Sequence, residues 1–223
     1  MGIYLNPGSA MFQKSLKSKI YVDKSGLLAI LNELVDTEQR YVCVSRPRRF
    51  GKSMAANMLA AYYGSSEDTS ALFASLEISQ CTGYREHLNQ YDVLKINMQD
   101  FLSESQSIEE MLAHLTACLI RDLKNGFTQI DFSYAKSLVS VMREVFAQTG
   151  RSFIILIDEW DCLFREYESN KEAQKQYLDF LRVWLKDKEY VGLAYMTGIL
   201  PIKKYGSHSA LNMFTEYSMT NPR

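Results

Sequence analysis

Residues 153–157, "FIILI", form a run of apolar side chains with no polar face, and the run ends directly in Asp158 and Glu159. A strand that is apolar on both sides is typical of a sheet covered on both faces. Helical patterns separate this run from two other strand-like segments, Tyr41–Val44 and Val191–Gly198. The alternation predicts an α/β fold with a mainly parallel sheet between two layers of helices.

Other segments also show the apolar patterns of strands or helices. Tyr91–Met98 is predicted as a further strand and Met213–Met219 as a weaker last one. Helix-forming composition or apolar spacing predicts helices over Ser25–Leu34, which we expect to carry a Ser or Asp cap, Ser53–Tyr63, Ile108–Leu123, Leu138–Phe146 and Tyr177–Asp187. The 223 residues show no internal repeat or low-complexity linker, so we expect one α/β domain.

Composition restricts the partners. The net charge of −1 provides no global field that would draw the chain to nucleic acid or to an anionic membrane. No apolar run approaches the roughly 20 residues of a membrane span and the N-terminus lacks a signal-peptide pattern, so we expect a cytoplasmic protein. The cysteines show no C-x-x-C spacing and are predicted as buried reduced thiols: Cys43, Cys81, Cys118 and Cys162.

The segment "SRPRRFGKS", residues 45–53, ends like a phosphate-binding loop. Gly51-Lys52-Ser53 follows a strand and opens a helix, where backbone N–H groups and the helix dipole favour an anion. Lys52, expected as a partly exposed cation, can reach β- and γ-phosphate oxygens, and the Ser53 hydroxyl can ligate Mg²⁺. Two features weaken the pattern: Arg46 stands where the motif has its leading glycine, and Pro47 supplies no N–H.

Asp158 and Glu159 come at the carboxyl end of their strand, the edge at which open α/β sheets bind ligands. Asp158 is predicted to hold Mg²⁺ through water, and Glu159 to polarise the attacking water as a general base. Thr197, at the end of the following strand, is a candidate to hydrogen-bond the γ-phosphate or that water. The loop and the acidic strand end support each other as two parts of one phosphoryl-transfer site.

Arg48 and Arg49 have three candidate roles. Local salt bridging is the first, since a short basic run on a neutral protein usually pairs with nearby carboxylates. A clamp on phosphate groups is the second. Contact with nucleic acid is the third and has least support, because no basic stripe with interleaved aromatic residues accompanies the two arginines.

Five stretches appear in a set order: "IYVDKSGLLAIL", "SRPRRFGKSMAANMLAAYY", "LFASLEIS", "LIDEWDCLF" and "MTGILPIKKYGSHSALNMFTEYSMTNPR". Together they resemble the AAA-ATPase-like family of bacterial proteins, a relative of the STAND and archaeal-ATPase branches of the P-loop NTPases. The resemblance spans nearly the whole chain. In that family the Arg-Pro-Arg-Arg-Phe form of the loop is usual, so Arg46 is interpreted as a family variant of the phosphate loop.

The resemblance implies a P-loop three-layer sandwich of the additional-strand type with a five-stranded sheet. The Val191 strand should lie between the Tyr41 and Phe153 strands, with the Tyr91 strand beyond the Phe153 strand. It also implies that the Tyr21–Lys24 segment lies near a nucleotide. Residues 1–40 are then a segment packed near the nucleotide site and 41–223 the ATPase core, with the helical lid of longer members, and their frequent restriction-endonuclease-like domain, absent.

The resemblance further implies ATP/ADP and Mg²⁺ as ligands, with the loop as the Walker A motif and the acidic strand end as Walker B. The predicted site comprises catalytic Glu159, Lys52 and Thr197; nucleotide-binding Pro47, Arg48, Arg49, Phe50, Gly51, Lys52, Ser53, Met54, Tyr21 and Asp23; and metal-binding Ser53 and Asp158.

The leading functional hypothesis is a Mg²⁺-dependent ATP hydrolase that acts as a switch or motor, alone or within a homo-oligomer or larger assembly. The alternative is a nucleotide-binding scaffold that hydrolyses little ATP and signals through protein partners. A P-loop kinase is disfavoured because Glu159 suits the activation of water better than transfer to a bound acceptor. A GTPase is excluded because no N-K-x-D stretch follows the sheet.

Overall fold

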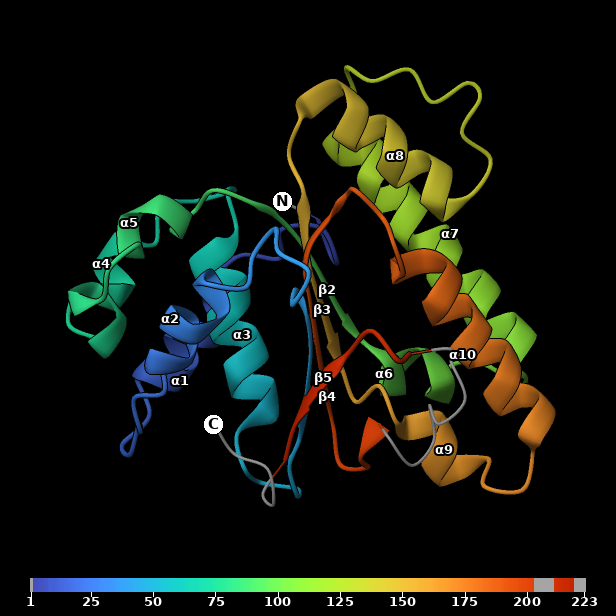
Figure 1. The fold of residues 1–223 in the computed structure, drawn as a ribbon, viewed down its shortest axis with the longest axis horizontal. Helices are drawn as coiled ribbons and strands as arrows, with labels where there is room; N and C mark the ends of the chain where they lie inside the picture. Colours follow the sequence, from blue (N-terminus) through green and yellow to red (C-terminus); the bar gives the residue numbers. More distant parts are fainter. Residues whose placement is uncertain (1, 203–210, 219–223) are drawn as a thin grey trace.

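A computed structural model, which describes residues 2–202 and 211–218, has a five-stranded sheet at its centre (Figure 1). The strand order is β2-β3-β4-β1-β5 and every pair is parallel. This confirms the predicted mainly parallel sheet and the order of β1 to β4 that the resemblance implies. The strands are β1 Tyr41–Ser45, β2 Asp92–Asn97, β3 Phe153–Asp158, β4 Val191–Gly198 and β5 Thr215–Tyr217. The weak last strand is confirmed over these three residues; Met219, the end predicted for it, lies outside the described residues.

Helices cover both faces of the sheet, which makes a three-layer sandwich (Figure 1). One layer holds α1 Ala10–Leu16, α2 Gly26–Asn32, α3 Lys52–Tyr63, α4 Ser70–Phe73, the 3-10 helix η1 Glu77–Gln80 and α5 Tyr84–His87. The other holds α6 Met98–Ser103, α7 Ile108–Gly126, α8 Leu138–Thr149, α9 Cys162–Glu166 and α10 Lys171–Leu185.

The apolar run that ends in Asp158 is buried on both sides, as predicted. Ile154 and Leu156 pack in the core beneath α3, whereas Ile155 and Ile157 pack in the core beneath α7, α8 and α10. Successive side chains of a strand point to opposite faces of the sheet, so a strand between two helical layers needs apolar residues at every position.

The start of α10 and the cap of α2 differ from the sequence predictions. α10 begins at Lys171, six residues before the predicted Tyr177, and its N-cap Asn170 accepts a hydrogen bond from the Ala173 N–H. The first turns are mostly polar, so the apolar period does not reveal them. α2 begins at Gly26 after Ser25, whose side chain makes no capping bond; its Oγ accepts instead from the Ile78 N–H. Ser25 therefore occupies the predicted N-cap position without making a capping hydrogen bond.

The cysteine prediction holds in part. All four cysteines are free thiols; Cys43, Cys118 and Cys162 are buried, but Cys81 is partly exposed. Burial raises the pKa of Cys162 to about 12, so this thiol stays protonated at neutral pH.

Over residues 2–202 and 211–218, no helix has the length and apolar character needed to cross a membrane. The same residues contain no cluster of three or more His, Cys, Asp or Glu side chains suited to a metal ion.

Candidate functional site

The loop between β1 and α3 has the backbone of an anion-binding loop. Arg49 and Gly51 both have left-handed backbone angles, with φ of 69° and 77°. Such residues alternating with right-handed ones turn successive N–H groups towards one point, forming a concave nest for an anion. Glycine adopts this conformation without strain at position 51, whereas the arginine at 49 must be held there by its surroundings.

The N–H groups in this loop are free. The amides of Arg48, Arg49 and residues 51–54 donate no hydrogen bond to any described residue. Four of them belong to Gly51 and the first turn of α3, where a helix leaves its N–H groups unpaired and its dipole is positive. The loop therefore presents several donors and a favourable field to an incoming anion.

Lys52 is the first residue of α3, and its side chain is turned inward. It is buried, with 8% of its surface exposed, and its Nζ donates to the carbonyl oxygens of Arg46 (3.1 Å) and Pro47 (3.2 Å). The predicted partial exposure is therefore wrong. Lysine has three donors, and two of them bond to the loop's own carbonyl groups.

The carboxyl ends of β3 and β4 bring the acidic residues and Thr197 together. Asp158 is buried, and its Oδ1 accepts from the Thr197 hydroxyl and from the Glu159 N–H at 3.0 Å. Glu159 has a left-handed backbone, with φ of 52°, and Trp160 N–H bonds to the Thr197 carbonyl oxygen at 3.1 Å. These bonds across the two strands fix the backbone from which the Glu159 carboxylate projects.

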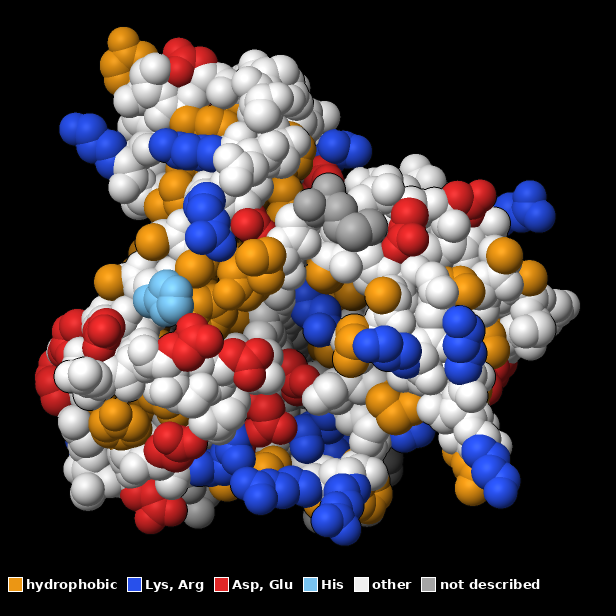
Figure 2. Space-filling model, turned by 180° about the vertical axis from the view of Figure 1, so that it is seen from behind, with side chains coloured by type: hydrophobic (Ala, Val, Ile, Leu, Met, Phe, Trp, Pro, Cys, Tyr) orange, Lys and Arg blue, Asp and Glu red, His pale blue; other side chains and the backbone are white. Residues whose placement is uncertain are grey.

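Glu159 faces the loop across a cleft of about 760 Å³, which we call the loop cleft. Arg48, Arg49, Lys52, Ser53 and Met54 line one part of it, and the ends of β2 and β3 with α6 and α9 line the rest. Figure 2 shows Lys and Arg side chains gathered along the lower edge of the molecule.

The predicted salt bridges of the loop arginines are not found. Arg48 and Arg49 are exposed, and neither forms an ion pair with a described residue. Both side chains line the loop cleft, so two guanidinium groups without a protein partner stand beside the free N–H groups. Of the roles proposed from the sequence, this geometry favours contact with phosphate.

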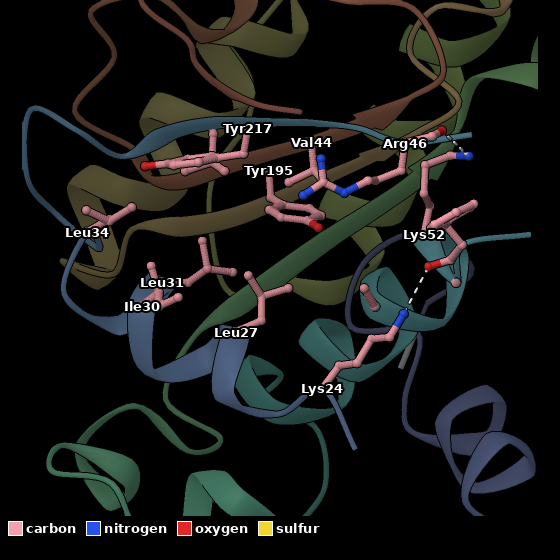
Figure 3. Close-up of a pocket in the computed structure, with 14 residues that line it drawn as sticks. Lys24, Leu27, Ile30, Leu31, Leu34, Val44, Arg46, Lys52, Tyr195 and Tyr217 are labelled. Atoms are coloured by element: carbon pink, nitrogen blue, oxygen red, sulfur yellow. Dashed lines mark hydrogen bonds between the residues drawn. The ribbon is translucent and has the colours of Figure 1, made fainter. Parts of the chain in front are cut away.

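A second cavity, the inner pocket of about 250 Å³, lies between α2 and the sheet on the other side of the loop (Figure 3). Leu27, Leu31 and Tyr195 are among its mainly apolar lining residues, and Gly51 and Lys52 line it where it meets the loop. Figure 3 shows the Arg46 side chain running back into this pocket beside Val44 and Tyr195. Arg46, which replaces the leading glycine of the motif, therefore lines the inner pocket with its side chain and adds nothing to the anion nest.

The N-terminal segment lies against the same loop. Lys24 Nζ donates to the Phe50 carbonyl oxygen at 3.0 Å, and Tyr21 lines an outer pocket of about 460 Å³ with Phe50 and Met54. Asp23 has a different place: its carboxylate accepts from the N–H groups of Ser25 and Glu77. Although desolvation raises the pKa of Asp23, these bonds outweigh it and lower the pKa overall. It lines none of the three cavities described above.

Asp161 and Arg165 were not predicted from the sequence. Asp161 is fully buried, and its Oδ2 accepts from the N–H groups of Ile199 (3.0 Å) and Leu200 (2.8 Å) just after β4. Arg165, on α9, donates to the Glu159 carboxylate at 2.5 Å and lies 3.6 Å from Asp161. The second aspartate of "DEWD" is a signal for this network, but its partners are far away in the chain.

Gly198 makes room for this network at the end of β4. A side chain at this position would place its Cβ 2.6 Å from Trp160 Nε1 and 2.7 Å from Asp161 Oδ1. The Gly198 carbonyl oxygen also accepts the Arg46 N–H at 3.0 Å, which joins the start of the loop to β4. The close approach of three elements therefore requires a glycine here.

Comparison with known proteins agrees with this arrangement. Residues 9–207 match the AAA-ATPase-like family, whose description is "Predicted AAA-ATPase". The chain belongs to this family. The matched range includes the 45–53 loop, the acidic end of β3 and Thr197. Membership supports nucleotide binding as the general activity of the site.

One curated relative is similar to this chain at low sequence identity. It is described as "Uncharacterized protein in vnfD 5'region" of Azotobacter chroococcum mcd 1 and is 26% identical over 204 residues. The aligned part covers 89% of this chain and 37% of the relative. The chain therefore spans little more than a third of that protein's length.

The buried position of Asp161 gives a prediction about stability. Asp161→Ala removes a buried charge that Arg165 and two backbone N–H groups depend on, so we expect a loss of about 3–5 kcal/mol in the free energy of unfolding. Asp179→Ala, which breaks the exposed pair with Arg182, is the matched control and should cost less than about 1 kcal/mol. Urea denaturation of both variants measures the difference; equal losses would show that Asp161 has no special structural role.

Proposed function

We propose that the chain is an ATP-binding, Mg²⁺-dependent ATPase module that hydrolyses ATP to ADP and phosphate and works as a switch or motor. The observation that carries this proposal is the set of free N–H groups at the start of α3, which face a cleft bordered by Glu159. Family membership supports the same general activity.

The phosphates would lie in the loop cleft. The nest around Arg49 and Gly51 offers its N–H groups to the β-phosphate, and the buried Lys52 would exchange its bonds to the loop carbonyl oxygens for phosphate oxygens. Arg48 and Arg49 would add charge from the exposed side. Each of these groups is a donor or a cation, which is the complement of a polyphosphate.

The donor set fits Mg²⁺, which takes oxygen ligands and retains several waters. The Ser53 hydroxyl is exposed at the cleft, and Asp158 has a second oxygen, Oδ2, without a hydrogen-bond partner among the described residues. Thr197 and the Glu159 N–H orient the Asp158 carboxylate through its other oxygen. When bound, the ion would neutralise charge on the β- and γ-phosphates.

Glu159 is the proposed general base. In the proposed reaction its carboxylate takes a proton from a water molecule while the water oxygen bonds to the γ-phosphorus and the bond to the β–γ bridging oxygen breaks. The carboxylate projects from a backbone that Trp160 N–H ties to β4, so its position relative to the loop is well defined.

The inner pocket is the proposed site of the base. It adjoins Gly51 and Lys52, and its lining is largely aliphatic and aromatic, which suits the flat face of a purine. Lys24, Arg46 and Lys52 are its charged lining residues, and none of the described residues that line it has a carboxylate to accept the N–H groups of guanine. This lining favours adenine.

Lys52 tests the phosphate site. Lys52→Ala removes the cation that would bind the β- and γ-phosphates, so ATP affinity measured by calorimetry should fall below detection. Thermal unfolding must accompany the titration, because the loss of two internal hydrogen bonds will lower the melting temperature slightly. Lys175→Ala, on the exposed side of α10, is the control. ATP binding by Lys52→Ala at the parent affinity would contradict the phosphate-loop assignment.

The base pocket predicts a difference between two ligands of the parent protein. ATP buries its base and should bind roughly tenfold or more tightly than inorganic triphosphate, since covering even part of a purine contributes a few kcal/mol. GTP should bind more weakly than ATP. Calorimetry with the three ligands in Mg²⁺ buffer checks this, and equal affinities for ATP and triphosphate would place the base outside the pocket.

Substitutions at Glu159 and Asp158 should have different effects, the first on turnover and the second on Mg²⁺-dependent binding. Glu159→Gln keeps Mg²⁺-ATP binding and lowers turnover by roughly a hundredfold or more, the scale for a lost general base. Asp158→Asn weakens the Mg²⁺-dependent part of binding, because it removes charge from the metal's surroundings. Single-turnover hydrolysis at protein concentrations above the dissociation constant, with calorimetry with and without Mg²⁺, separates the two effects.

A nucleotide-binding scaffold is the second candidate. It is favoured by the ion pair between Arg165 and Glu159, which occupies the proposed general base. A scaffold predicts ATP binding with a parent turnover near background and no difference between the parent and Glu159→Gln. Equal single-turnover rates would therefore favour the scaffold over the ATPase.

A further inference from the structure

Arg165 contacts two carboxylates, those of Glu159 and Asp161. Its guanidinium donates to Glu159 Oε2 at 2.5 Å, and its Nε lies 3.6 Å from Oδ2 of the buried Asp161. The side chains of Arg165 and Glu159 are 20% and 23% exposed, so both reach the loop cleft from a largely buried position. An arginine in this setting is held at its base by Asp161 while its tip borders the cleft.

The present contacts leave donors of Arg165 unused. A guanidinium carries five N–H donors in a planar fork. The Arg165 Nε is buried without a hydrogen-bond partner, and the contact to Glu159 engages one terminal nitrogen. A single-oxygen contact does not use the fork, which matches a bidentate anion such as a phosphate.

The loop supplies the place for such an anion. Arg48, Lys52 and Ser53 line the same cleft as Arg165, and the N–H groups of these three residues donate no hydrogen bond to a described residue. A terminal phosphate bound at the loop would lie between these donors and Glu159. It would bring negative charge to the carboxylate that now holds Arg165, and two anions on one side of a cation compete for it.

We propose that Arg165 is a phosphate-sensing arginine that restrains Glu159 through their ion pair and moves to the γ-phosphate when ATP binds. The exchange frees the Glu159 carboxylate to act on water and supplies a cation to the phosphoryl group from the same chain. This inference rests on the proposed ATPase function. Because the adjacent Trp160 N–H bonds to the Thr197 carbonyl oxygen of β4 and the Glu159 N–H bonds to Asp158, only the two side-chain ends need to move.

The decisive variants are Arg165→Gln and Arg165→Lys, with Arg182→Gln as the control because Arg182 forms an exposed pair with Asp179 on α10. Arg165→Gln should bind ADP like the parent, lose roughly tenfold of the preference for ATP over ADP, and lower the single-turnover rate on the order of a thousandfold. Arg165→Lys, which keeps the charge, should recover part of both losses.

Glu159→Gln provides a test that leaves Arg165 and its anchor intact. Removing the competing charge should raise the affinity for ATP relative to ADP by roughly fivefold, the scale of one ion pair. Calorimetry with ATP and ADP measures this ratio for the parent and each variant. Unchanged ratios in both Arg165→Gln and Glu159→Gln would overturn the exchange of partners.

Other results would also overturn the inference, and they are distinguishable. A faster single-turnover rate in Arg165→Gln would mean that Arg165 only inhibits Glu159. ATP binding by the parent with an unaltered rate in Arg165→Gln would leave the ATPase proposal standing and remove the role of Arg165. Absence of ATP binding by the parent itself would overturn both.

Discussion

The side chains of β3 are buried on both faces of the sheet, and this burial decides where the polar groups of the site stand. Phe153 to Asp158 pack between two helical layers, and the strand pairs in parallel with β2 and β4. Pairing with β2 and β4 therefore fixes the position of the carboxyl end of β3. Asp158 meets Thr197 there, and β1, beside β4, ends in the loop at the same edge.

The electrostatics of the site are local. The whole chain carries a net charge of −1, yet Arg48 and Arg49 have no ion-pair partner among the described residues, and Lys52 is buried against carbonyl oxygens. Cations and free N–H groups gathered without matching acidic groups favour an anion in that place. The acidic side chains lie across the cleft at the end of β3, which gives the site one basic and one acidic part.

Arg165, Glu159 and Asp161 join these two parts. Asp161 is buried and bonded to the backbone after β4, so it anchors Arg165, while Glu159 is the partner that reaches the cleft. A network with one fixed and one exchangeable partner can respond to a ligand without any change in the fold. The same contacts link the buried cluster at the sheet edge to the carboxylate that we propose as the general base.

The sequence by itself determined the fold class and, through the family resemblance, the order of β1 to β4. It also indicated the segments of the candidate site. Apolar runs and helical periods depend on local spacing, and the loop motif occupies adjacent residues, so both are readable along the chain. Only the tertiary structure decided that Lys52 is buried, that Asp23 binds backbone N–H groups away from the cavities, and that Arg46 enters the inner pocket. It alone brought Arg165 of α9 to Glu159. The reason is physical: side-chain partners are chosen by the packing of several elements, and a short helix such as α9 has too little periodicity to show which way its residues face.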